Sequence, residues 1–123
     1  MRQQPDENKI LDKKCQSLLD EKGVRFAGVI NNMGRQVAGG YKSTITPLVD
    51  EEDHKISLEH ALEIQITKDL DESLGSIDSI ITRRKKVIMI TIPMENSSLL
   101  MSTELDSNAE KIVKTASKLF NVH

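Results

Sequence analysis

The eight residues at 86–93, KVIMITIP, constrain the fold of this chain more than any other segment. Their apolar side chains, from Val87 to Ile92, are nearly continuous, which indicates a strand that is covered on both faces. Pro93 ends the run, because proline has no N–H to give to a sheet ladder. The sequence therefore predicts a central strand with other elements packed over both of its faces.

Four more segments have the composition of strands, and turn residues separate them. Gly34 follows the apolar segment at 24–31 and supplies the positive φ that a short hairpin turn needs. The pairs Arg84–Lys85 and Asn96–Ser97 mark turns on either side of the central strand. The five expected strands are residues 24–31, 36–40, 77–83, 86–93 and 98–103. They form an antiparallel hairpin and an antiparallel meander.

Three segments repeat apolar residues at spacings of three and four, as amphipathic helices do. These expected helices are residues 8–21, 56–74 and 108–121. Gly23 and Gly75 follow the first two, at the position where helices commonly turn left-handed. Asp106 or Ser107 is the expected cap of the last helix. The predicted order, α-β-β-α-β-β-β-α, describes one α+β domain at residues 8–123 after a flexible N-terminus at residues 1–7.

The middle helix carries more apolar surface than one contact with a core requires. Five residues recur every four positions, and Ala61 and Ile64 lie to one side of that stripe. The stripe consists of Leu58, Leu62, Ile66, Leu70 and Leu74. Either this helix is buried on two sides within its own chain, or one of its apolar sides binds a partner.

Composition excludes several classes of function. The 17 basic and 19 acidic side chains give a net charge of −2, and only Phe26, Tyr41 and Phe120 are aromatic. A nucleic-acid binder needs a basic footprint and stacking platforms, so nucleic acid is not an expected partner. No segment approaches the roughly 18 apolar residues of a membrane span, and the polar N-terminus lacks the apolar core of a secretion signal. The single Cys15 excludes an intrachain disulfide, and we expect a cytoplasmic protein.

Candidate catalytic and metal-binding residues are isolated. His60 and Glu63 have the spacing of metal ligands on a helix, but His54 and His123 lie in a loop and at the terminus, and a metal site needs three or four ligands. Cys15 lies on the apolar stripe of the first helix, where a free thiol usually packs as a small hydrophobe. We therefore expect no metal, no cofactor and no catalysis.

Two further clusters allow a structural and a functional interpretation. The basic cluster consists of Arg83, Arg84, Lys85 and Lys86. It either contacts an anion or an acidic partner, or it is a charged hairpin tip that prevents strand aggregation; the acidic residues 50–53 could offset it within the chain or across a dimer. The loop cluster consists of Gly39, Gly40, Tyr41 and Lys42. Its glycines either let the chain leave the sheet edge or let a ligand approach the backbone, and they match no phosphate-binding motif.

The order of elements resembles that of the roadblock/LC7 family, which is akin to profilin. Its most specific segments are FAGVINNMGRQVAGG at 26–40 and RRKKVIMITIPMENSSLLMSTE at 83–104. Residues 25–40 and 84–93 are also similar to segments of a group of small archaeal proteins, especially those of ammonia-oxidising archaea; that similarity implies fold and origin, not function.

The roadblock resemblance implies a non-enzymatic homodimer or heterodimer that serves as a platform for small GTPases or motor subunits. Pairing would use the middle helix and the adjacent strand. The implied interface residues are Leu58, Ala61, Leu62, Ile64, Gln65, Lys68 and Ile80. The first hypothesis is thus a dimeric adaptor. A second is a small-molecule sensor with a cavity near residues 39–44, and the third, an enzyme, lacks an acid–base pair.

Overall fold

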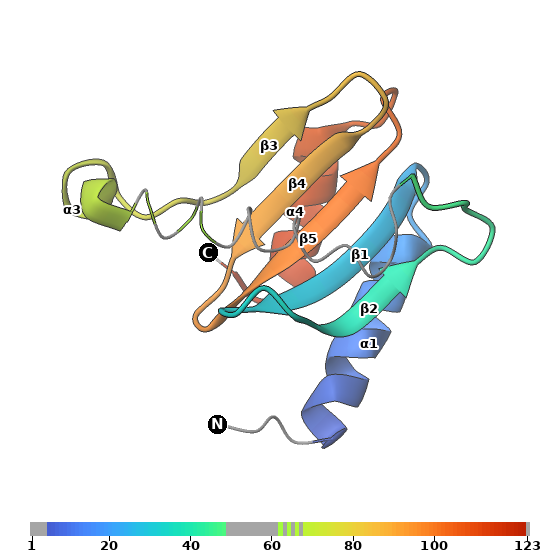
Figure 1. The fold of residues 1–123 in the computed structure, drawn as a ribbon, viewed down its shortest axis with the longest axis horizontal. Coiled ribbons are helices and arrows are strands. Elements are labelled where there is room, and N and C mark those ends of the chain that lie inside the picture. The colour runs from blue at the N-terminus through green and yellow to red at the C-terminus, as the bar shows by residue number, and fades with distance from the viewer. Residues whose placement is uncertain (1–4, 49–61, 63, 65, 67, 123) are drawn as a thin grey trace.

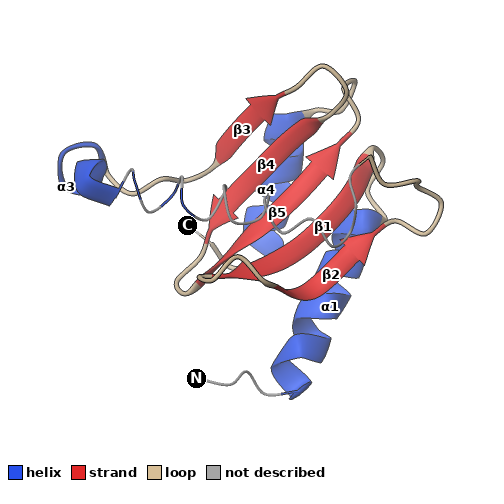
Figure 2. Ribbon diagram, in the orientation of Figure 1, coloured by secondary structure: helices blue, strands red, loops and turns tan. Residues whose placement is uncertain are grey.

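A computed structural model describes residues 5–48, 62, 64, 66 and 68–122 of the chain. Five antiparallel strands form one sheet in the order β2-β1-β5-β4-β3 (Figure 1; Figure 2). The strands are β1 Val24–Asn31, β2 Gln36–Tyr41, β3 Ile80–Arg83, β4 Ile88–Pro93 and β5 Ser97–Thr103. The helices are α1 Pro5–Leu19, the 3-10 turn η1 Lys68–Leu70, α3 Asp71–Leu74 and α4 Ala109–Leu119. The predicted α+β fold with an initial hairpin and a meander is confirmed.

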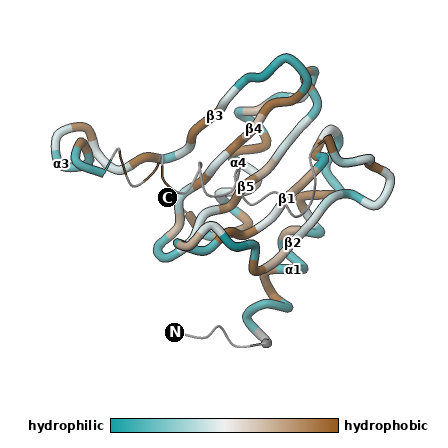
Figure 3. Tube along the Cα trace, in the orientation of Figure 1, coloured by the Kyte–Doolittle hydropathy of each residue, from teal (hydrophilic) through white to brown (hydrophobic). Residues whose placement is uncertain are grey.

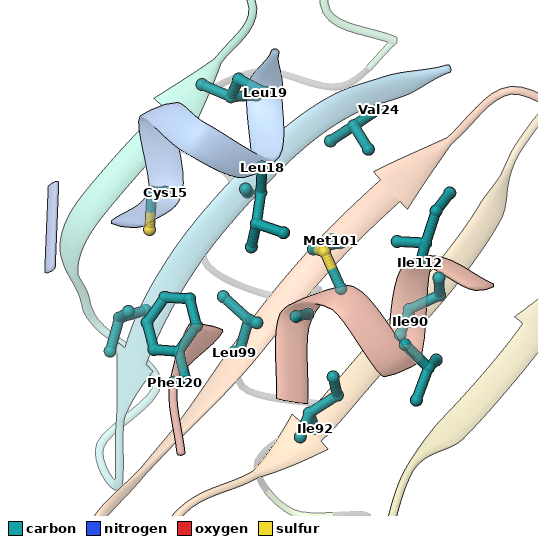
Figure 4. Packing of buried hydrophobic residues seen from close by; sticks show 14 of the residues in the cluster. Cys15, Leu18, Leu19, Val24, Ile90, Ile92, Leu99, Met101, Ile112 and Phe120 are labelled. Atoms are coloured by element: carbon teal, nitrogen blue, oxygen red, sulfur yellow. The ribbon is translucent and has the colours of Figure 1, made fainter. Parts of the chain in front are cut away.

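One face of the sheet packs against α1 and α4. Ile90 and Ile92 of β4 and Leu99 and Met101 of β5 point toward these helices, where they meet side chains such as Leu18 (Figure 4). Residues of the opposite parity, such as Thr91 and Leu100, are buried as well. Strand β4, which makes up most of the segment 86–93, is thus covered on both faces, as predicted. It is an internal strand, however, and β5 takes the middle of the sheet.

The structure corrects the expected end of the second strand. Gly39 and Gly40 do not break it, because both pair with β1 and the ladder continues to Tyr41, opposite Phe26. The pairing of β1 with β2 is irregular at another place, a bulge where the register shifts between Val29 and Ile30. In contrast, the positive φ predicted for the first hairpin turn is present, at Gly34.

Other boundaries move by a few residues. β3 begins at Ile80, three residues later than predicted, and β4 begins at Ile88. The cap of α4 is neither Asp106 nor Ser107. Asn108 has extended backbone angles, and its side chain accepts a hydrogen bond from the Lys111 N–H at 3.1 Å.

The expected middle helix is described only in part. Residues 62, 64 and 66 are helical, and the chain then tightens into η1 before the single turn of α3. Gly75 ends α3 with φ at +84°, and its N–H donates to the Asp71 carbonyl at 2.8 Å. The predicted stop at this glycine is confirmed.

Candidate interaction surface

The outer edge of β3 has unpaired backbone groups. The Arg84 N–H donates to the Val87 carbonyl at 2.9 Å, so this pair faces inward. Because bonded and non-bonded pairs alternate in an antiparallel ladder, Thr82 and Ile80 also bond to β4. The N–H and C=O of Ile81 and Arg83 then point away from the sheet, and no hydrogen bond within the described part of the chain satisfies them. No strand within the described ranges pairs with this edge, so its outward groups are available to another strand.

The other edge of the sheet, along β2, is closed by side chains of the same chain. The Asp12 carboxylate of α1 accepts a hydrogen bond from the Gly39 N–H at 2.8 Å, and the Gln36 amide donates to the Gly39 carbonyl at 2.9 Å. Gly39 has φ at +88°, and the register is bulged nearby. Bulges and edge-capping groups hinder strand addition. Of the two edges, β3 is therefore the better template for a partner strand.

An apolar segment projects next to that open edge. Neither η1 nor α3 contains a buried residue, and Figure 1 shows α3 lying beyond β3, away from the other strands. Ile66 and Leu74 are 75% and 77% exposed, and Leu62 and Leu70 are about half exposed. These four are the members of the predicted five-residue stripe that the structure describes, and from here on the apolar stripe means these four residues. Single exposed apolar residues are ordinary, but several on one projecting segment mark an interaction site.

Ile64 faces the other way. It is only 8% exposed and so packs within its own chain. At 100° per residue, positions two apart lie on opposite sides of a helix, which explains why Ile64 is buried while Leu62 and Ile66 are exposed. In the single chain Ile64 is therefore buried, although it is one of the residues of the implied interface.

The remaining residues of the implied interface differ in how far they are described. Lys68 is exposed and Ile80 is half-buried. Three implied interface residues, Leu58, Ala61 and Gln65, lie outside the described residues. The residues considered as metal ligands, His54, His60, Glu63 and His123, also lie outside them.

The basic cluster forms the tip of the β3–β4 hairpin. All four of its side chains are exposed, and the tip is strongly hydrophilic in Figure 3. The ion pair between described residues lies elsewhere: Arg25 Nη1 is 2.6 Å from Glu104 Oε1. Glu104 lies at the same end of the sheet as the tip but is engaged by Arg25.

The loop cluster has structural contacts. The rings of Tyr41 and Phe26 lie 4.9 Å apart in an edge-on arrangement, and the Lys42 ammonium donates to the Glu21 carbonyl at 3.3 Å. Neither of two hollows in the described surface is lined by this cluster. One, of about 250 Å³, lies between Ile64 and the β4–β5 turn, and the other, of about 380 Å³, lies along α4. The ligand role predicted for residues 39–42 gains no support from them.

The single thiol is placed for packing. Cys15 is fully buried, and burial, followed by the negative charge of Asp12, raises the pKa of its thiol from 9.0 to about 12. Among the residues that the structure describes, no three metal-ligating side chains cluster, and no helix is long and apolar enough to span a bilayer.

The fold is similar to that of MglB in a tetrameric arrangement, with a TM-score of 0.81, 12% identity, and 95% of this chain and 87% of that chain covered. It is also similar to a roadblock/LC7 domain from Streptomyces avermitilis, with a TM-score of 0.71, 9% identity, and 90% and 92% covered. Myxococcus xanthus MglB has a TM-score of 0.71, 9% identity, and 98% and 95% covered.

At these identities the similarity establishes the fold alone. No curated protein matches the sequence. A family described as a "family of unknown function (DUF6659)" matches residues 5–121, nearly the whole chain. This chain, whose fold is that of roadblock/LC7 domains, therefore belongs to the DUF6659 family.

Proposed function

We propose that this chain is a non-enzymatic interaction module that forms a homodimer through the β3 edge and the apolar stripe. The observation that carries the proposal is the projecting segment formed by Ile66 and residues 68–74. It exposes Ile66, Leu70 and Leu74 and has no buried residue between Lys68 and Leu74. Exposed apolar side chains that contribute nothing to their own core are best explained by a surface that another chain covers.

A second copy is the partner that the geometry favours. Two-fold pairing brings the same patch of each chain together, and an antiparallel ladder joins two identical edge strands in that way. The free groups of Ile81 and Arg83 would then bond to the second copy while the stripe packs beside them. The tetrameric arrangement reported for a protein of this fold supports self-association.

Sedimentation measurements on the wild type and on designed variants test whether the chain forms this dimer. Sedimentation equilibrium of the wild type should give twice the chain mass of 13.8 kDa. Leu70→Lys combined with Leu74→Lys should raise the dissociation constant at least about 100-fold, since each buried leucine contributes roughly 1.5–3 kcal/mol. Both side chains are exposed in the single chain, so circular dichroism should be unchanged.

A matched control separates this surface from general apolar exposure. Met33→Lys combined with Leu105→Lys changes two other exposed apolar side chains and should leave the mass unchanged. A wild type that remains monomeric at high concentration would overturn the dimer. Ile64→Glu is not a useful test, because Ile64 is buried and the change would destabilise the fold itself.

The dimer would act in the cytosol as a platform for a protein partner, and the roadblock resemblance points to a small GTPase. Calorimetric titration with purified small GTPases, in their GDP and GTP-analogue forms, tests this part. Binding by the dimer that is lost in the Leu70→Lys, Leu74→Lys variant would support a platform role. Failure to bind any GTPase in either nucleotide state would contradict it and leave the dimer untouched.

A further inference from the structure

We propose that the basic hairpin tip of one copy forms ion pairs with the acidic segment that precedes β3 in a second copy. This inference rests on the proposed dimer and adds its register and its source of specificity. The tip carries four positive charges at residues 83–86. The segment at residues 68–79 carries Asp69, Asp71, Glu72 and Asp78 against Lys68, a net charge of −3. The two regions lie at opposite ends of the short strand β3.

Antiparallel pairing brings these opposite ends together. In a two-fold ladder, the end of each β3 strand lies beside the beginning of the other. The tip of one copy therefore lies beside residues 76–79 of the second, and α3 projects from the same region (Figure 1). A parallel ladder of two β3 edges would instead place the two like-charged tips side by side.

The hydrogen-bonding pattern restricts the register. Outward groups must meet outward groups, and in the two such registers that are centred on the middle of β3, Ile81 pairs with Ile81 or with Arg83 of the second copy. In the first register, Asp78 lies opposite Arg84 of the second copy, and in the second it lies opposite Lys86. At about 3.3 Å per residue, the charged pair lies roughly 10 Å from the two-fold axis in the first register and roughly 13 Å from it in the second. Both registers therefore place Asp78 against a cation of the tip.

Among the described residues, neither charged group has an ion-pair partner in its own chain. The tip and Asp78 form no ion pair in the described part of the chain, where the close pair joins Arg25 and Glu104. Asp78 borders the hollow along α4 near Lys114 and Lys118, but no ion pair joins them. Opposite charges directly across a ladder stabilise pairing, and like charges oppose it. Four cations on one turn therefore favour a second copy with the opposite charge at this place.

Charge reversal tests the proposed ion pairs separately from the existence of the dimer. Arg84→Glu combined with Lys86→Glu covers both registers and should raise the dissociation constant about tenfold or more at low salt. The effect should shrink at about 0.5 M salt, where charges are screened. The reversal Lys9→Glu with Lys13→Glu, on the exposed side of α1, is the matched control and should leave the constant unchanged.

Mixing variants gives the decisive readout. The tip-reversed chain and an Asp78→Lys chain should each dimerise poorly alone but combine into a heterodimer, since both trans pairs are then complementary. A wild-type monomer would overturn the dimer and this inference together. A dimer of unchanged affinity after tip reversal, or no preferred heterodimer on mixing, would overturn this inference and leave the proposed dimer standing. The first of these results would also indicate that the tip binds an acidic partner protein instead of a second copy.

Discussion

The carboxylate of Asp12 accepts a hydrogen bond from the Gly39 N–H at 2.8 Å and so attaches α1 to the outer edge of β2. The two residues are 27 positions apart in the sequence. Their contact supplies an acceptor for an N–H group that points away from the sheet. It makes the two edges of the sheet unequal, because the outward groups of Ile81 and Arg83 at the β3 edge have no such contact within the described residues.

Replacement of Asp12 should weaken this attachment. Asp12→Ala removes the acceptor and should lower the free energy of unfolding by about 1 kcal/mol, the usual contribution of one hydrogen bond. Asp12→Asn keeps an acceptor oxygen and should lose less than half of that. Denaturant unfolding measures both, with Asp20→Ala, another exposed carboxylate of the same region, as control. Equal losses for Asp12→Ala and Asp12→Asn would contradict the assigned role.

The adjacent glycines of β2 should differ sharply in their tolerance of alanine. A Cβ on Gly39 would clash with the Ala27 carbonyl oxygen, at a φ of +88°. Gly39→Ala should therefore cost about 3 kcal/mol or more of folding stability. A Cβ on Gly40 meets nothing within 4 Å, so Gly40→Ala should change stability by less than about 0.5 kcal/mol. Thermal unfolding of the two variants side by side checks the contrast.

Cys15 should be inert in the folded protein and should make stability depend on pH in alkali. Its pKa is raised from 9.0 to about 12, so above pH 9 the unfolded chain loses the thiol proton while the folded chain keeps it. Stability should then fall with rising pH, by up to about 1.4 kcal/mol per unit until pH 12. Cys15→Ala should unfold with a smaller alkaline slope. Rapid reaction of the native thiol with a disulfide reagent at pH 8 would be inconsistent with this burial.

Proline at Arg83 should separate folding from association. Its N–H points to the open edge, so Arg83→Pro removes a donor that the single chain does not use, which edge strands tolerate. Circular dichroism should remain that of the folded chain, while sedimentation should show a monomer. Arg83→Ala, which keeps the N–H, should remain dimeric. A dimer of normal affinity for Arg83→Pro would mean that this edge does not pair.

The fold was predictable where local chemistry decides it. Apolar runs and turn residues located all five strands, and Gly34 and Gly75 have the positive φ that their positions required. The acceptor for Gly39 was not predictable, because nothing in the local sequence connects Asp12 to a strand 27 residues away. Gly39 and Gly40 were wrongly expected to end β2 for the same reason: the bulge and the distant carboxylate keep them in the ladder.

The helical segment that carries the apolar stripe shows a second property that sequence periodicity alone does not predict. Periodicity locates the two apolar sides of the helical segment, but it does not say which side meets the core of its own chain. The structure buries Ile64 and exposes Ile66, so the side that carries Ile64 meets the core. The order of strands, and with it the identity of the free edge, depends on contacts far apart in the sequence. It could be inferred only by resemblance to the roadblock/LC7 family.

Amide hydrogen exchange along β3 is the most direct test of the proposed pairing. In a concentrated sample, the N–H groups of Ile81 and Arg83 should exchange as slowly as those of Ile80 and Thr82, which bond to β4 in every state. On dilution to the monomer, the first pair should become fast while the second stays protected. A sample with the mass of a dimer in which Ile81 and Arg83 exchange rapidly would contradict pairing through this edge.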